Sequence, residues 1–497
     1  MNRLVIPVAS RIEIASLAVI AFIATAVHLT TLDEAGILKP FNIVISLAIM
    51  AALGWRAFTL VREDAAYIFT PALWFRAATL VYFGFGNIVP YIVGWEVEAY
   101  LRYVFDFTDH ELLKLNLIIL VGILSVLSLE VAFARSFQSM FERMPSLRPP
   151  ARGQGLWSTC LALLILGGLF RYLVILPQLV GAQTAIVPGV FGYLGYLFYA
   201  GLFLLLLYSL RTGGRKAALS ISLVAFEIVI CLCSFAKTHL LLTSMIVWLA
   251  FLHDRMSLRR LVIGSISLVL VYISMIPLVD YGRVQMLTIY GSLNGANLGT
   301  RLGFVTDFFT NPAPAAAVDT APRMDRTLNR LSYANVSTYL INAYDGGVPG
   351  ETYGAAVTVL VPRIIWRDKP NISNQGIELT QLIYGFDTSS TGSGVFSEAY
   401  WNYGWMGLML GMAFYGILIS FLTQLSLVVM RREIWIFVPV VFAGVQFGTR
   451  VDGRMSVDVV GSFGIIIVLF LSLIAASRLT SDSSRRAVMP GTPDLSR

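Results

Sequence analysis

The last two apolar stretches of the chain are joined by a short, highly charged segment, GTRVDGRMSVD (residues 448–458). Arg450 and Arg454 lie four residues apart, a spacing that places two side chains on one face of a helix. Two guanidinium groups on one face can each donate paired hydrogen bonds to a diphosphate. The alternative is an ion-pair network at the helix ends, in which Asp452 and Asp458 neutralise the two arginines. The pattern favours diphosphate binding and leaves the network open.

Further cations border other apolar stretches. Lys237 and His239 stand between two such stretches in SFAKTHLLL, and Arg283 closely follows another. Because lipid makes charge costly, each needs a partner, water or a ligand. Lys237 is either a helix-end side chain that reaches the interface or, with Arg283, a contributor to diphosphate binding. A lone histidine is more often packed than catalytic, and no second histidine stands at metal-ligand spacing, so no metal site is predicted.

Arginines recur between residues 301 and 330. They are Arg301, Arg323, Arg326 and Arg330, and the last three are spaced to fall on one face of a helix. A solvated helix face is one explanation. The other is binding of anionic lipid head groups or of an anionic glycan. Arg326 and Arg330 are therefore candidate glycan-binding residues.

Residues that could carry chemistry are densest between residues 351 and 416. A short apolar run ends in Pro-Arg-x-x-Trp-x-x-Lys-Pro (residues 362–370), and a stretch rich in Gly, Ser and Thr leads to Ser-Glu-Ala-Tyr-x-Asn-x-Gly-x-x-Gly (residues 397–407). Arg363 and Lys369 are candidate diphosphate ligands. Glu398 is the preferred general base, because a carboxylate partly shielded from water where the chain re-enters the membrane suits acid-base chemistry. Alternatively, Glu398 is a salt-bridge partner that locks this segment to the helices.

The same segment is rich in aromatic residues and glycines. Trp366, Tyr400 and Asn402 are candidate sugar contacts, whereas the other aromatic residues are interpreted as anchors at the membrane interface. The glycines are expected to serve turns and close helix approach and not to bind phosphate, because no strand, glycine loop and helix follow one another here.

Together, the two motifs resemble those of bacterial oligosaccharide repeat-unit polymerases of the Wzy, or O-antigen polymerase, type. That family also has many membrane spans and a large periplasmic loop late in the chain. The resemblance implies a GT-C-like fold and transfer of a growing glycan from an undecaprenyl-diphosphate carrier to the non-reducing end of a second lipid-linked repeat unit. Such a glycosyltransferase needs a cationic site for the leaving diphosphate, a base for the acceptor hydroxyl, and a groove for sugars and lipid.

The resemblance and the charge pattern together assign roles to specific residues. Catalysis is assigned to Glu398 and Arg363, binding of the diphosphate and lipid carrier to Arg363, Lys369, Arg283, Arg450, Arg454 and Lys237, and glycan binding to Trp366, Tyr400, Asn402, Arg326 and Arg330. No metal or other cofactor is expected. The expected partners are the lipid-linked donor and acceptor, membrane lipid and a chain-length regulator of the polysaccharide co-polymerase kind, but not nucleic acid.

The amino-acid composition indicates what kind of structure holds these residues in place. Hydrophobic residues make up 57% of the 497 residues and charged residues 13%, and mean hydropathy is +0.75. A water-soluble chain of this length would not tolerate that balance on its surface. The net charge of +7 is explained by cytoplasmic loops rich in Lys and Arg and not by nucleic acid. The three cysteines lie in apolar stretches and offer no disulfide framework or zinc site.

Apolar runs long enough to cross a bilayer, about 20 residues each, predict about twelve transmembrane helices. They lie near residues 12–31, 41–61, 68–92, 112–133, 156–176, 190–210, 217–236, 238–252, 260–279, 404–430, 434–449 and 456–477. Lys and Arg collect in alternate connections, so the positive-inside rule places both termini in the cytoplasm. The chain is thus predicted to be an all-α membrane protein, and the resemblance implies that the membrane is the bacterial inner membrane.

The hydropathy pattern also divides the chain. Residues 1–279 form an N-terminal bundle of about nine helices, residues 280–403 a large periplasmic loop with short surface helices, residues 404–477 the C-terminal transmembrane helices, and residues 478–497 a disordered cytoplasmic tail. Within the loop, residues 326–344 predict an amphipathic helix that stops at Gly346 and Gly347. The active site is expected on the periplasmic side.

Three other functions stay open. A lipid-linked glycan ligase of the same superfamily is expected to use a loop histidine, for which His239 and His110 are the candidates. In a flippase or transporter, charges line a path through the bundle, and Arg76 and Arg171 are the best candidates for this. A structural partner of a synthase complex is the third.

Overall fold

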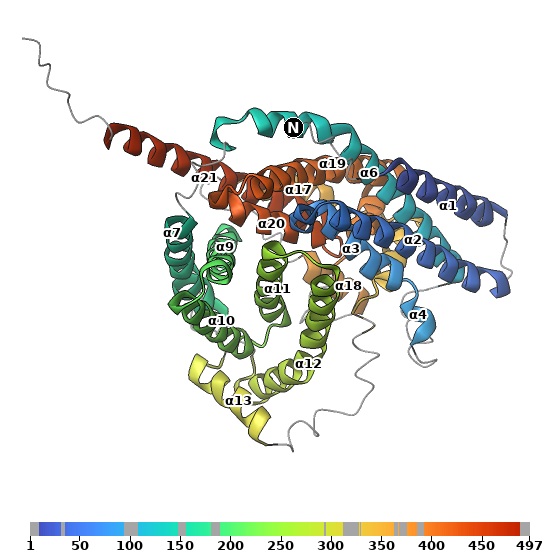
Figure 1. Ribbon diagram of the computed structural model, residues 1–497. Coiled ribbons are helices and arrows are strands. Elements are labelled where there is room, and N and C mark those ends of the chain that lie inside the picture. Colours follow the sequence, from blue (N-terminus) through green and yellow to red (C-terminus); the bar gives the residue numbers. More distant parts are fainter. Residues whose placement is uncertain are drawn as a thin grey trace, which may run out of the picture. The chain divides into compact units, whose positions relative to one another are not determined.

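The computed structural model describes residues 9–30, 35–93, 108–147, 156–179, 189–292, 295–311, 328, 330–361, 366, 375–384 and 392–487. Throughout these residues, every regular element is a helix (Figure 1). Ten of the helices are long and apolar enough to cross a membrane. The chain is therefore an all-helical, multi-pass membrane protein.

These ten helices coincide with ten of the twelve predicted spans. They are α1 (Arg11–Thr30), α2 (Ala35–Glu63), the run Pro71–Ile92 with α3 (Pro71–Thr79) and α4 (Val89–Ile92), α6 (Asp109–Arg143), the run Leu156–Ile175 with α7 (Leu156–Leu169), α9 (Gly189–Thr212), α10 (Arg215–Cys233), α12 (Leu258–Tyr290), α19 (Val395–Arg431) and the run Met455–Ser477, which leads into α21 (Val460–Ala487).

The other two predicted spans are also helices, but they do not combine the length and the hydropathy that a membrane crossing needs. α11 (Lys237–Asp254) has polar residues at both ends, and the short apolar helix Trp435–Thr449 includes α20 (Val438–Thr449). Ten, and not twelve, of the described helices therefore qualify as spans. α12 is longer than predicted because it continues to Tyr290. It ends at Gly291, whose φ of 66° is the left-handed conformation typical of a helix C-cap. Arg283 consequently lies on a helix and not in the loop.

The chain folds into two compact units, each assembled from segments far apart in the sequence. Unit 1 comprises residues 1–143, 322–431 and 443–465, and unit 2 comprises residues 144–321, 432–442 and 466–497. The boundary predicted at residue 280 does not separate them, and the predicted loop contributes to both. Hydropathy could not reveal this division because it locates helices but not their packing partners.

Unit 1 is built around α19, which packs most extensively against α6; Figure 1 shows the two helices side by side. At Gly416 a Cβ atom would lie 2.5 Å from the carbonyl oxygen of Val126, so a larger residue would force the helices apart. Glycine at such a crossing lets the two backbones approach closely. Ser420 Oγ donates to the carbonyl of Glu130 at 3.0 Å, which fixes the same pairing.

A buried ion cluster joins three helices of unit 1. Arg76 on α3 donates from Nε to Glu13 on α1 at 2.8 Å and from Nη2 to Glu130 on α6 at 3.2 Å. None of the three side chains is more than 1% exposed. Breaking such a pair leaves an uncompensated buried charge, so the cluster holds the three helices in one arrangement.

α19 is interrupted where its motif ends. Tyr403 (φ −143°, ψ 27°) and Gly404 (φ 58°, ψ −142°) leave the helical conformation, and a Cβ on Gly404 would lie 2.7 Å from the hydroxyl of Tyr344. Only glycine adopts the Gly404 angles without strain. The break falls at residue 404, where the tenth span is predicted to start, whereas the apolar helix as a whole covers Val395–Arg431. Glu398, Tyr400 and Asn402 lie on the short helical segment before it.

Among the described residues between 330 and 394, unit 1 has three helices: α16 (Ala334–Asp345), α17 (Thr352–Leu360) and α18 (Gln375–Tyr384). The prediction of a surface helix over residues 326–344 is wrong in two respects. The helix begins later, at Ala334, and most of its side chains are buried because it packs against α6 and α19. Its predicted end at Gly346 and Gly347 is confirmed.

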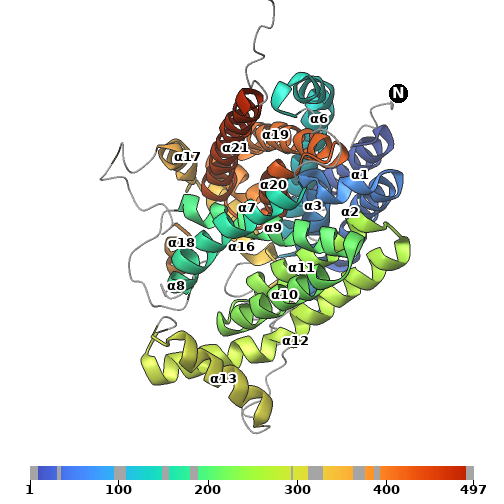
Figure 2. The ribbon, with the colours of Figure 1, turned by 60° about the vertical axis from the view of Figure 1, so that its left-hand side comes forward.

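In unit 2, α7 packs against α9, and α9 against α10 and α11. A Cβ on Gly167 would lie 2.0 Å from the backbone nitrogen of Phe198, so this glycine permits the close crossing of α7 and α9. α13 (Leu298–Thr310) lies against α12, as Figure 2 shows. Arg171, in the π-helical continuation of α7, pairs with Glu227 on α10 at 2.6 Å, and both side chains are at most 3% exposed.

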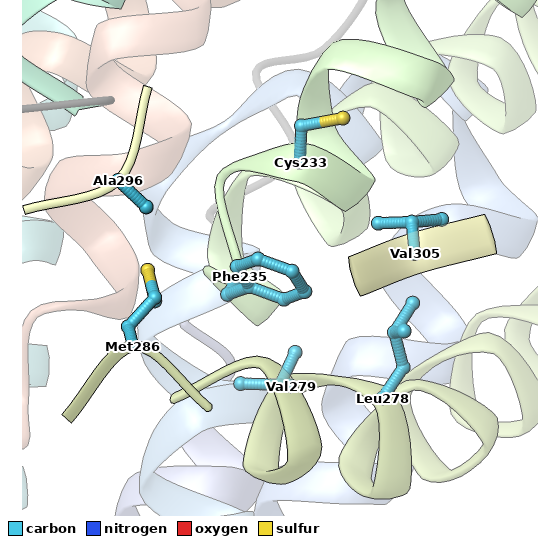
Figure 3. Packing of buried hydrophobic residues seen from close by; sticks show 7 residues of the cluster. All are labelled: Cys233, Phe235, Leu278, Val279, Met286, Ala296 and Val305. Carbon is cyan, nitrogen blue, oxygen red and sulfur yellow. The ribbon is translucent and has the colours of Figure 1, made fainter. Parts of the chain in front are cut away.

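The turn between α10 and α11 is held by an apolar cluster (Figure 3). Phe235, with a φ of 48°, lies at its centre among residues of α12, α13 and the intervening turn. The ring fills the space above Gly282, where a Cβ would lie 2.1 Å from it. This packing fixes the position of Lys237, which follows Phe235 by two residues.

The tail differs from the prediction. α21 continues to Ala487, so residues 478–487, which were expected to be disordered, are helical. A helix already formed by the apolar span is extended residue by residue, without a new nucleation step, and this segment lacks proline and glycine. The final ten residues lie outside the described part of the chain.

Candidate functional site

Glu398 is the centre of a polar cluster in unit 1. Its side chain is fully buried. One carboxylate oxygen accepts from Ser456 Oγ at 2.5 Å and Thr352 Oγ1 at 2.6 Å, and the other from the Met455 backbone N–H at 2.5 Å and Ser393 Oγ at 3.4 Å. A carboxylate accepts about four hydrogen bonds, so Glu398 is fully occupied. It joins α17 to the segment that begins the last span.

Asn402, one helical turn after Glu398, completes this link to α17. Its amide nitrogen donates to Thr352 Oγ1 at 2.8 Å, and its amide oxygen accepts from the backbone N–H of Tyr353 at 3.1 Å. The side chain is 3% exposed. Burial raises the pKa of Tyr353, and the adjacent Glu398 carboxylate adds to the rise. In this arrangement Asn402 holds the first turn of α17 and does not face solvent.

Replacing Glu398 by glutamine is expected to lower the free energy of unfolding by about 1–3 kcal/mol, because an amide group would meet donors and leave one without an acceptor. The measurement is the thermal unfolding midpoint in detergent. Glu351→Gln, an exposed carboxylate beside the same helix, is the matched control and should leave the midpoint unchanged. An inactive Glu398→Gln variant with wild-type stability would instead support the predicted role as a base.

The segment predicted to hold two arginines on one helical face is a turn, so that interpretation is wrong. α20 ends at Thr449, and the next helical residue is Met455. The turn is fastened to the motif, since the Val395 N–H donates to the Val451 carbonyl at 3.0 Å and Met455 donates to Glu398. The structure thus brings together Glu398 and the arginine-bearing turn, which the sequence placed in separate motifs.

Arg454 is the cation of this turn with the clearest capacity for a ligand. Its Nε lies 3.4 Å from Asp458 Oδ2, and its side chain is 13% exposed. Its Nη1 is buried and has no hydrogen-bond partner among the described residues. A buried donor without an acceptor is costly, and an anionic oxygen would satisfy it.

Asp452 lies in the same turn. Burial raises the pKa of its carboxyl group, and the nearby Arg450 guanidinium opposes that rise. Tyr333 Oη donates to Asp452 at 3.5 Å, which links the turn to the residue before α16. The predicted ion-pair network is therefore present in part: Arg454 pairs with Asp458, and Arg450 interacts with Asp452.

Lys237 and Arg283 belong to unit 2, where the structure brings them to one turn. Arg283 Nε donates to the carbonyl of Phe235 at 3.3 Å, and Lys237 Nζ lies 5.8 Å from the centre of the Tyr272 ring. Arg301, also in unit 2, is buried and donates to the carbonyl of Ala296 at 2.8 Å, and burial lowers its pKa. Arg301 therefore anchors the chain between α12 and α13.

Three predicted residues, Arg363, Lys369 and Arg326, lie outside the described residues. Two further predicted glycan contacts are described and accessible. Trp366 is 41% exposed, and Arg330 is exposed in the turn before α16. Tyr400, by contrast, is 3% exposed.

The structure reveals an ion pair at Tyr400 that sequence reasoning missed. Asp345, the last residue of α16, accepts from Tyr400 Oη at 3.0 Å and pairs with Lys114 on α6. The Asp345 side chain is 37% exposed and that of Lys114 20%. The only signal in the sequence was Lys114, a cation at the predicted outer end of a span, where positive residues are not expected.

The two arginines that favoured transport, Arg76 and Arg171, are each paired with buried carboxylates of neighbouring helices. These pairs account for both charges without a transport pathway. Across the described ranges, no group of three His, Cys, Asp or Glu side chains is placed to hold a metal ion.

No protein-family model, curated protein or solved structure matches this chain.

Proposed function

We propose that this chain polymerises undecaprenyl-diphosphate-linked oligosaccharide repeat units at the periplasmic face of a bacterial inner membrane. In this proposal the chain crosses the membrane about twelve times, with both termini in the cytoplasm and a GT-C-like arrangement of helices. The sequence motifs at residues 362–370 and 397–407 suggest the reaction class.

The observation that carries the proposal is the junction of the second motif with the Arg450–Arg454 turn. Glu398 binds Met455 and Ser456, and Arg454 directly precedes them with a buried, unpartnered Nη1 among the described residues. A cation of this kind suits the leaving diphosphate, whose negative charge grows as the glycosidic bond breaks. Arg450, Arg363 and Lys369 are proposed to add to that stabilisation.

The partners follow from this reaction. A lipid-linked donor and a lipid-linked acceptor are both required, and a chain-length regulator is a further candidate. Trp366 and Arg330 are the proposed glycan contacts that are exposed in the structure. Tyr400 and Asn402 are buried, so they are proposed to support the site through their contacts with neighbouring side chains and not to touch the glycan.

A glycan ligase is the second candidate, and one contact favours it. His110 stacks on His28, with ring centres 4.6 Å apart, and His28 lies close enough to Lys114 and Asp345 to interact with both. A ligase is expected to use a loop histidine, and His110, one of the two candidates, lies in the first turn of α6.

Deleting the gene tests these functions against one another. Cells without the chain are expected to accumulate single repeat units on the lipid carrier and to display single-unit surface glycan, as seen by mass spectrometry and gel electrophoresis. Full-length polymer retained on the carrier would support ligation instead. Repeat units confined to the cytoplasmic leaflet would support transport.

A further inference from the structure

Unit 1 contains a second carboxylate beside the motif, and unlike Glu398 it is accessible. We propose that Asp345 is the general base that takes the proton from the acceptor hydroxyl, an inference that rests on the proposed polymerase function. Glu398 then serves as a positioning residue, which holds α17 and the Arg454 turn in register.

Accessibility decides between the two carboxylates. A base must come within hydrogen-bond reach of the proton that it abstracts. Glu398 has no exposed surface, and its oxygens are occupied by four donors. The Asp345 side chain is 37% exposed, and two side chains, Tyr400 and Lys114, bind it.

Asp345 is also well positioned. It is the last residue of α16, which packs against α6 and α19, and two hydrogen bonds fix its carboxylate from both sides. Lys114 and Tyr400 thus hold the Asp345 carboxylate in one orientation. The Lys114 ammonium lies 5.3 Å from the centre of the Tyr400 ring, which keeps all three side chains together.

The surroundings suit a sugar. Trp405 packs edge-on against Tyr400 with ring centres 5.4 Å apart and is 38% exposed. An accessible aromatic ring next to a carboxylate and a cation provides an apolar face for a pyranose and polar groups for its hydroxyls. Asp345, Lys114 and Trp405 therefore form a candidate acceptor subsite.

The proposed step balances as follows. The acceptor hydroxyl oxygen attacks the anomeric carbon of the donor glycan while its proton passes to the Asp345 carboxylate. The bond from the anomeric carbon to the diphosphate breaks, and its electron pair leaves with undecaprenyl diphosphate. The proton later passes from Asp345 to water or to the released diphosphate.

The test uses the purified full chain in nanodiscs with undecaprenyl-diphosphate-linked repeat units, and it records the initial rate of chain extension. Asp345→Asn is expected to lower the rate about 100-fold or more, with an unchanged unfolding midpoint. Added formate is expected to restore part of the rate of Asp345→Ala, an effect that a purely structural role would not produce. Glu351→Gln is the control and should extend chains at the wild-type rate.

Several outcomes would overturn the assignment. If Asp345→Asn extends chains as fast as wild type, Asp345 is not the base, whereas the polymerase function stands. If Asp345→Ala unfolds at a lower temperature and formate has no effect, the residue is structural. If the wild-type chain itself makes no polymer, the proposed function fails and the assignment of Asp345 fails with it.

Discussion

Replacing Arg76 by methionine is expected to lower the free energy of unfolding by about 3–5 kcal/mol, the largest stability effect that the structure predicts. Methionine retains much of the side-chain volume but leaves Glu13 and Glu130 without their common partner. Both carboxylates are at most 1% exposed, so water cannot compensate for the lost charge. The measurement is the unfolding midpoint in detergent, together with the abundance of the protein in membranes.

Two further variants make this result specific. The triple variant Arg76→Met, Glu13→Gln, Glu130→Gln removes all the charges and should recover most of the stability, because an uncharged cluster has no buried ion to desolvate. Arg11→Met, at an exposed arginine at the start of α1, should have little effect. Wild-type stability of Arg76→Met alone would show that the ion cluster does not hold the helices together.

Replacing Arg454 by alanine is expected to slow chain extension by about 100- to 1000-fold, the loss typical when one donor to a developing charge is removed. The reason is the buried Nη1, which has no partner among the described residues and is available to a diphosphate oxygen. Arg454→Lys should retain part of the rate because it keeps the charge but not the paired donors. Initial rates at several donor concentrations provide the measurement.

Asp458→Asn is the matched control for Arg454. It removes the ion-pair partner at 3.4 Å and leaves the guanidinium in place. If Arg454 only braces the turn, Asp458→Asn and Arg454→Ala should slow extension equally. If Arg454 binds the diphosphate, only the arginine variants should lose most of the rate.

Hydropathy predicted the helices well because a membrane span leaves a long apolar run in the sequence. Helices occur at all twelve predicted positions, and the predicted start of the tenth span coincides with the break at Gly404. The division into two units could not be predicted, since it depends on contacts such as that between α6 and α19, which lie far apart in sequence.

The candidate site shows the same contrast. The motif identified Glu398 but not its environment, because all four of its donors come from outside the motif, at Thr352, Ser393, Met455 and Ser456. Arg450 and Arg454 had helical spacing, yet they lie in a turn anchored by Val395 and Glu398. Asp345 carried no recognisable pattern, and only packing brings it to Tyr400 and Lys114.

The most direct test of the central claim is incubation of the purified wild-type chain with undecaprenyl-diphosphate-linked repeat units in nanodiscs, with products separated by size on a gel. Polymerisation predicts a ladder whose steps are single repeat units and whose formation releases undecaprenyl diphosphate. A well-folded protein that makes no ladder, and instead moves the lipid-linked unit across the bilayer or transfers it to a different lipid, would contradict the claim.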